Sequence, residues 1–289
     1  MLNDPSALLH GDFLIHNYRR QIRPEPEPNM PAILPLSAAR RPARIVQSSW
    51  LQHGPFAFWI VDALKPRLIV ELGCHNGYSF CCFCEQMRAS GVEGRAIAID
   101  TWQGDEHAGA YDENVYANLS AYVSRQYPDL AELKRMYFSE ALPTVADGSI
   151  DLLHVDGRHF YNDVVEDFTS WIPKLSDRAV VLFHDTQVHD RDFGVYKYWA
   201  ELEKQYPTFE FRHGHGLGVL GFGKNIPTAV RGLFDETADP AATSATRTAF
   251  ASQGRRIYLR WLLGWLRKNG LKSMRRKIVY TLRGRRLAA

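Results

Sequence analysis

The sequence predicts an α/β fold with a mostly parallel sheet and helices on both of its faces. Three observations support this prediction: short apolar runs recur along the chain, helical patterns separate them, and the runs are continuously apolar rather than alternating. Continuously apolar strands are typical of parallel sheets buried on both faces. The 289 residues, 45% of them hydrophobic, suit one domain of about 200 residues with extensions.

The elements follow from these patterns in chain order. The first helix, Trp50–Leu64, has apolar residues at helical spacing and a break near Pro55. Strands are expected at Leu68–Leu72, Ala96–Ile99, Arg135–Phe138, Ile150–Val155, Ala179–Phe183, Phe209–Phe211 and Gly218–Phe222. Further helices are expected at Tyr78–Ala89, Glu113–Arg125, Ser139–Thr144, Phe160–Trp171 and Phe193–Gln205. The sheet would therefore have seven strands.

Composition divides the chain into four parts: a proline-rich arm at 1–47, the α/β domain at 48–226, a linker at 227–253 and a basic tail at 254–289. The four cysteines lie close together, in and just before the predicted helix Tyr78–Ala89. This arrangement is ill suited to a disulfide framework. We expect no transmembrane helix, because no apolar run reaches about 18 residues. We also expect no signal peptide, because the N-terminus lacks a basic region followed by an apolar stretch. The expected location is the cytoplasm.

A glycine turn follows the first strand. The run Glu71-Leu-Gly73-Cys-His-Asn-Gly77-Tyr-Ser79 lets the backbone approach a ligand closely, since glycine carries no Cβ. The spacing departs from the three-glycine dinucleotide fingerprint. Glu71 would repel a phosphate and favour a cationic amino-acid group. Asp100, which ends the next strand, can bind the hydroxyls of a ribose.

Acidic residues also end the two later strands of the domain. Asp156 follows one apolar strand and Asp185 the next, so both would lie at the carboxyl edge of a parallel sheet. Two carboxylates there can bind a divalent cation. His159, three residues after Asp156, could reach a substrate hydroxyl from the start of the next helix.

Together these motifs resemble class I S-adenosylmethionine (SAM) methyltransferases. The stretch Asp156-Gly-Arg-His159 followed by a helix, and then His184-Asp185-Thr186, resembles the Methyltransf_24 family and related metal-dependent sugar O-methyltransferases. The resemblance covers about Ser48 to Lys224 and implies a Rossmann-like fold whose last two strands form an antiparallel hairpin. It also implies an enzyme that methylates a hydroxyl of a sugar, glycan or glycosylated metabolite.

The resemblance assigns roles to individual residues. It implies SAM binding by Glu71, Gly73, Gly77, Ser79 and Asp100, with Trp102 and Ser139 at the adenine, although packing and helix capping explain those two equally well. His159 would be the general base. Asp156 and Asp185 would orient the substrate, either through Mg²⁺ or by direct hydrogen bonds. His184 departs from the pattern, because the metal-dependent sugar O-methyltransferases of macrolide biosynthesis have an acidic residue at this position. Magnesium prefers oxygen ligands, so a histidine here would weaken its binding.

The tail from Gly254 to the end holds 12 basic and no acidic residues. Within it, Ile257, Trp261, Leu262 and Trp265 share one helical face, and Arg256, Arg260 and Arg267 occupy another. This pattern fits a helix at an anionic membrane surface, which would place the protein peripherally at the inner membrane. Docking onto the body or a partner is the main alternative, and nucleic acid is less favoured.

Other functions stay open. A methyltransferase acting on nucleic acid, protein or another small molecule is the second enzyme hypothesis, and a non-catalytic SAM-binding module is a third. The intact set of Glu71, Asp100, Asp156, His159 and Asp185 argues against the non-catalytic alternative. The sequence leaves the sugar, the hydroxyl and the formation of a homo-oligomer undetermined.

Overall fold

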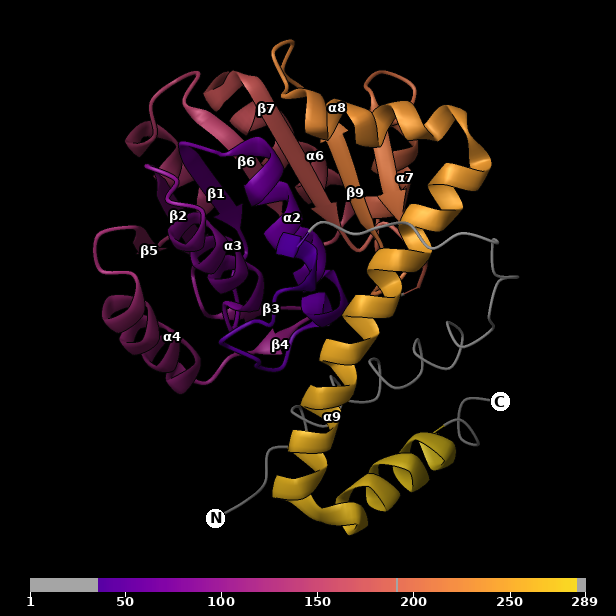
Figure 1. Cartoon of the computed structure of the whole chain (residues 1–289). Helices are drawn as coiled ribbons and strands as arrows, with labels where there is room; N and C mark the ends of the chain where they lie inside the picture. Colours follow the sequence, from indigo (N-terminus) through magenta and orange to yellow (C-terminus); the bar gives the residue numbers. More distant parts are fainter. Residues whose placement is uncertain (1–35, 191, 285–289) are drawn as a thin grey trace.

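The predicted α/β architecture is confirmed by the computed structural model, which describes residues 36–190 and 192–284 (Figure 1). A seven-stranded sheet has the order β5-β2-β1-β6-β7-β9-β8. Its strands are β1 (Leu68–Leu72), β2 (Arg95–Asp100), β5 (Ala131–Arg135), β6 (Ile150–Val155), β7 (Leu175–His184), β8 (Thr208–Phe211) and β9 (Leu217–Gly221). All neighbouring strands pair in parallel except β9, which is antiparallel to β7 and β8, as the resemblance implies.

Helices cover both faces of the sheet and bury two hydrophobic clusters. Over one face lie α2 (Gly54–Leu64), α3 (Tyr78–Ala89), α4 (Glu113–Gln126) and α8 (Thr228–Asp235). Over the other lie α5 (Phe138–Ala141), α6 (Tyr161–Trp171) and α7 (Val195–Leu202). Burial on both faces explains why the central strands are continuously apolar.

One predicted strand was misplaced. The strand expected at Arg135–Phe138 is β5, Ala131–Arg135, and Phe138 instead begins α5. Strand β5 lies at the edge of the sheet and pairs only with β2, and none of its residues is fully buried. An edge strand needs no continuous apolar run, so the charged sequence Ala-Glu-Leu-Lys-Arg did not stand out.

The predicted linker at 227–253 is instead helical. It contains α8, a short 3₁₀ helix η5 (Glu236–Ala238) and the start of α9 (Pro240–Gly284). Asp239 caps α9 by accepting a hydrogen bond from the Ala241 N–H at 2.8 Å, and Pro240 supplies a favourable first helical residue. Alanine has the highest helix propensity, so the Ala/Thr/Ser composition that indicated a linker also permits a helix.

The described part of the proline-rich arm packs on the domain. The 3₁₀ helix η1 (Leu36–Ala39) buries Ala38, and the Arg44 guanidinium donates to the Asn76 carbonyl at 3.3 Å. The rest of the predicted arm, residues 1–35, lies outside the described residues. Near Pro55 the expected break occurs, where the 3₁₀ helix η2 (Ser49–His53) gives way to α2.

Candidate active site

A cavity of about 960 Å³ opens at the carboxyl edge of the sheet. Its walls come from the residues that follow β1, β2, β5, β6 and β7, which is where open α/β sheets bind ligands. A small hairpin of β3 (Gly104–Asp105) and β4 (Gly109–Ala110) and one face of α6 complete it. The volume is at the upper end of the range for small-molecule sites, roughly 300–1,000 Å³, so a cofactor and an acceptor can fit together.

Most of the predicted site residues line this cavity. They are Gly73, Ser79, Asp100, Ser139, Asp156, His159 and Asp185. The structure therefore brings together residues that are as far apart as 112 positions in the sequence, because parallel strands present their carboxyl ends at one edge. Glu71, Gly77 and Trp102 do not line it.

The glycine turn after β1 needs glycine for steric reasons. Gly73 has a φ of 86°, and a Cβ there would come within 3.0 Å of the Asp156 carbonyl oxygen. Gly77 has a φ of 72°, and its missing Cβ makes room for the side chain of Leu119 on α4. Gly73 thus lets the turn approach the end of β6, whereas Gly77 serves helix packing beneath the cavity.

Asp100 fixes the shape of this turn. One carboxylate oxygen accepts hydrogen bonds from the backbone N–H groups of Cys74 and His75, both at 2.9 Å, and the other accepts from the Trp102 N–H at 2.7 Å. An ionised carboxylate has about four acceptor positions, so about one is left for a ribose hydroxyl. Asp100 therefore organises the backbone as well as facing the cofactor position.

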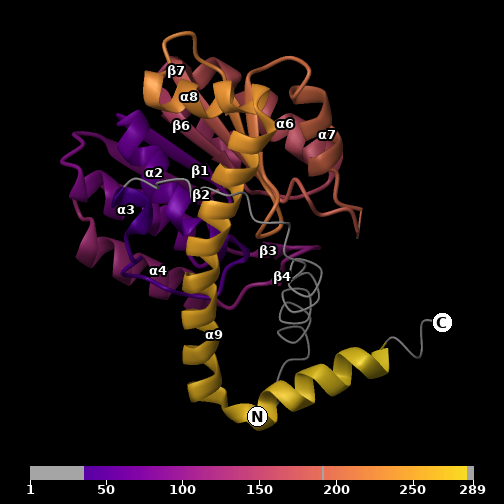
Figure 2. The same cartoon turned by 45° about the vertical axis from the view of Figure 1, so that its right-hand side comes forward.

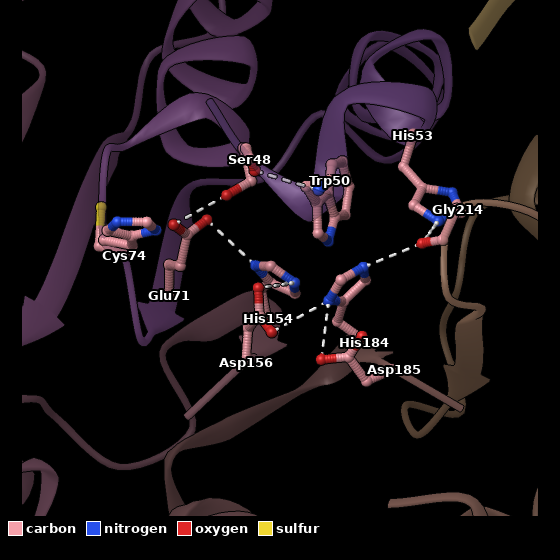
Figure 3. Close-up of polar contacts among 12 residues, drawn as sticks. Ser48, Trp50, His53, Glu71, Cys74, His154, Asp156, His184, Asp185 and Gly214 are labelled. Carbon is pink, nitrogen blue, oxygen red and sulfur yellow. Dashed lines mark hydrogen bonds and ion pairs between the residues drawn. The ribbon is translucent and has the colours of Figure 1, made fainter. Parts of the chain in front are cut away.

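Glu71, which the resemblance assigns to SAM binding, does not line the cavity. Glu71 is fully buried, where it accepts a hydrogen bond from the Ser79 hydroxyl at 3.0 Å and contacts His154 Nδ1 at 3.1 Å (Figure 3). Burial raises the pKa of Glu71, and the His154 contact opposes that rise. Since β1 and β6 place Glu71 beside His154, the carboxylate supports the floor of the cavity from below.

Trp102, for which an adenine contact and core packing were both expected, packs in the core and does not line the cavity. Its side chain is 2% exposed and belongs to the hydrophobic core, and its indole N–H donates to the His75 carbonyl at 2.9 Å. Trp102 has a φ of 52°, so the chain turns sharply just after Asp100 and directs the indole inward. Trp102 therefore stabilises the glycine turn from the core side.

Two carboxylates and two imidazoles meet at the ends of β6 and β7. His184 Nδ1 lies 3.1 Å from Asp156 Oδ1 and 3.4 Å from Asp185 Oδ2, and its Nε2 lies 3.2 Å from the Gly214 carbonyl oxygen (Figure 3). His159 Nε2 lies 2.9 Å from Asp185 Oδ2. Both nitrogens of His184 face acceptors, so its imidazole is held as a doubly protonated cation.

The charges in this cluster support one another. Burial alone would lower the pKa of His184, but Asp185 and Asp156 raise it well above its usual value. Burial would also lower the pKa of His159, but its hydrogen bonds to Asp156 and Asp185 raise that pKa to about 9. The two imidazoles in turn lower the pKa of Asp156 and of Asp185 against the opposing effect of burial. At neutral pH two anions and two cations balance.

His159 is held in place by neighbours that the sequence did not indicate. The Phe193 ring stacks on its imidazole with centroids 4.5 Å apart, and the His107 ring meets it edge-on at 5.4 Å. His107 comes from the β3–β4 hairpin, which was not predicted because each of its strands has only two residues. Nothing in the sequence pointed to a site role for Phe193, which only begins the predicted helix Phe193–Gln205.

The cavity lining is strongly acidic. It includes eight carboxylates and one arginine, Arg158, and no lysine. Arg158 is itself paired with Glu106 at 2.9 Å and with Asp163 at 3.3 Å. On α6, burial together with the neighbouring Asp163 and Glu166 raises the pKa of Asp167 to about 7. Such a lining favours cationic or neutral hydroxylated ligands and disfavours polyanions.

Part of the chain is similar to a known protein family. Residues 70–186 match the Methyltransf_24 family, which is described as a methyltransferase domain. The protein y4gI of Sinorhizobium fredii (strain NBRC 101917 / NGR234) is 55% identical over 179 residues, which cover 62% of this chain and 20% of that protein. The chain therefore matches only about a fifth of the length of this relative.

Two solved structures align with this chain at low sequence identity. A methyltransferase from Geobacter sulfurreducens is 19% identical, with 73% of this chain and 96% of that chain covered and a TM-score of 0.46. The O-methyltransferase TomG from Streptomyces achromogenes is 16% identical, with 72% and 96% covered and a TM-score of 0.47. The match runs from within β1 to the end of β7, so the part of the chain that forms most of the cavity is similar to the methyltransferase domains of the Methyltransf_24 family.

Proposed function

We propose that this domain transfers the methyl group of SAM to a hydroxyl of a sugar or glycan. The observation that carries the proposal is the cavity, in which the glycine turn and Asp100 face the same space as Asp156, His159 and Asp185. SAM supplies the reactive methyl group. The protein must hold a hydroxyl in line with it and remove the hydroxyl proton, and positioning alone can contribute roughly 7–11 kcal/mol.

His159 is suited to accept that proton. Its Nε2 donates to Asp185, which leaves Nδ1 as the basic atom of the neutral ring, and Nδ1 is buried without a hydrogen-bond partner. An acceptor hydroxyl would satisfy this nitrogen. Asp185 orients the imidazole and stabilises it once it is protonated, as the acidic partner does in other base–carboxylate pairs.

The acidic lining supports a neutral, hydroxyl-rich acceptor. Sugar hydroxyls donate hydrogen bonds to carboxylates, and eight carboxylates line the cavity. The same carboxylates would repel the phosphates of a nucleic acid, so the lining disfavours nucleic acid as the methyl acceptor. A cationic sulfonium donor is attracted by this charge.

A direct test of the proposal combines binding with transfer. Calorimetry is expected to give heat with SAM and with S-adenosylhomocysteine, and labelled SAM is expected to methylate neutral sugars or oligosaccharides in an acceptor panel. The panel also contains catechols, uronic acids and RNA. No heat with either cofactor would refute a SAM enzyme, and transfer only to catechol or RNA would refute the sugar assignment. Transfer only to uronic acids would refute the preference for a neutral acceptor.

The side chains at the predicted metal position do not fit Mg²⁺. Magnesium requires a near-octahedral shell of oxygens. Around the oxygens of Asp156 and Asp185, the neighbouring donors are ring nitrogens of His184 and His159, at 2.9–3.4 Å. These imidazoles already compensate the two carboxylates. We therefore propose that Asp156 and Asp185 orient the acceptor through direct hydrogen bonds.

Magnesium is accordingly expected to be dispensable. Turnover should change less than about twofold with EDTA or with added Mg²⁺, and titration of Mg²⁺ into the protein should give no heat, because protonated imidazoles already balance the charge of the two carboxylates. Activity lost on chelation and restored by Mg²⁺ would contradict this expectation. Restoration by Zn²⁺ or Mn²⁺ alone would show that a metal binds through the mixed nitrogen and oxygen donors.

A further inference from the structure

The second half of helix α9 extends beyond the α/β body, as both views show (Figures 1 and 2). In its first half, Phe250, Ile257 and Tyr258 are buried against the core that includes α2 and η2. From Leu259 to Gly270 every residue is exposed or half-buried. The helix bends at Gly270, where φ is 72°. This projecting segment has no role in the proposed chemistry.

A leucine stripe runs along the projecting segment: Leu259, Leu263 and Leu266. Their spacing of i, i+4 and i+7 places all three on one face of the helix. At 100° per residue this face points away from the one that buries Ile257 and Tyr258 against the body. Leu259 and Leu263 are 42% and 56% exposed, although apolar side chains of this size are usually buried.

The apolar face expected from the sequence packs on the body over part of its length. Ile257 is buried, and Trp261 and Leu262 are partly buried against the same core. The leucine stripe lies on another face of the helix.

Basic residues border the stripe. Arg256, Arg260 and Arg267 are exposed on the same segment, next to the leucines in the helical projection. Residues 254–289 hold 12 of the 35 basic residues and none of the 32 acidic ones, so the rest of the chain has a net charge near −9. An anionic surface would attract the tail and repel the body.

We propose that the leucine stripe and its bordering arginines dock α9 in the head-group region of an anionic lipid surface. Self-association through the stripe would bring two arginine-lined segments together with no acidic partner, which costs free energy. Nucleic acid would use the arginines but not the leucines. Only a surface that is apolar below and anionic above satisfies both sets of side chains. Among the described residues no helix is long and apolar enough to cross a membrane, which suits a helix that lies in the interface.

The test uses the full chain without cofactor or acceptor, so its outcome is independent of the proposed catalysis. Co-sedimentation is expected with vesicles of phosphatidylcholine and phosphatidylglycerol, and not with pure phosphatidylcholine. The double variant Leu259→Gln/Leu263→Gln should lower the partition coefficient about tenfold or more, because it removes apolar area and keeps helix propensity. Arg256→Gln/Arg260→Gln should also weaken binding and reduce its dependence on salt.

The matched control is Ser252→Gln, an exposed position on the body-packed half of α9, which should bind vesicles like the wild type. Equal binding by the leucine variant and the control would overturn the proposal. So would a leucine-dependent dimer in light scattering without vesicle binding, or binding to duplex RNA that the arginine variant loses and the leucine variant keeps.

Discussion

Replacing His159 with alanine is expected to reduce methyl transfer by roughly 10²–10⁴-fold, the usual contribution of a general base. The substitution removes the nitrogen that would take the hydroxyl proton and leaves the glycine turn and Asp100 in place. SAM affinity should therefore stay within a few-fold of the wild type. Transfer of label from SAM to the acceptor found in the panel measures the first quantity, and calorimetry measures the second.

Two further variants separate the base from a structural role. His159→Gln can still donate to Asp185 but cannot take a proton, so it should be as inactive as the alanine variant. His189→Ala removes an exposed histidine that does not line the cavity, and it should leave turnover unchanged. Full activity of His159→Gln would exclude His159 as the base.

The pH profile gives a second readout for the same residue. With a pKa of about 9, His159 is mostly protonated at pH 7, and only its neutral form can act as a base. The wild-type kcat/KM should therefore rise with pH, close to tenfold per unit below the pKa, and level off above it. In His159→Gln the remaining activity should lack this rise.

The site was predictable where a single residue directly ends an apolar run. Asp100, Asp156 and Asp185 each follow such a run, and a parallel sheet brings the ends of its strands to one edge. The observed sheet places these three residues where their positions after the apolar runs predicted. His159 was predictable for the same reason, since it follows Asp156 by one short turn.

Residues whose role depends on a distant partner were not predictable. Glu71 lies on β1, but its surroundings are determined by His154, its register partner on β6. The sequence does not state which strands are neighbours, so a strand-end glutamate looked like a ligand. His184 owes its charge to the neighbouring Asp185 and also to Asp156, which follows a different strand.

Replacing Gly73 with alanine is expected to have the other large effect. The added Cβ would come within 3.0 Å of the Asp156 carbonyl oxygen, and this backbone atom cannot turn aside as a side chain could. The left-handed φ of 86° adds a further cost of roughly 1–2 kcal/mol. The free energy of unfolding should fall by about 2–5 kcal/mol in total, since overpacking typically costs 1–3 kcal/mol. SAM affinity should fall at least about tenfold as the turn moves away from β6.

Gly91→Ala provides the matched control for this substitution. Gly91 also has a left-handed φ, 60°, but a Cβ there meets nothing within 4 Å, so the variant carries the backbone cost without the clash. Thermal unfolding and SAM calorimetry on both variants isolate the steric term, because the conformational penalty is shared. If Gly73→Ala is no less stable and binds SAM no more weakly than Gly91→Ala, the close approach of the β1 turn to β6 is not what shapes the cofactor half of the cavity. A larger loss in both measurements ties cofactor binding to that one backbone contact.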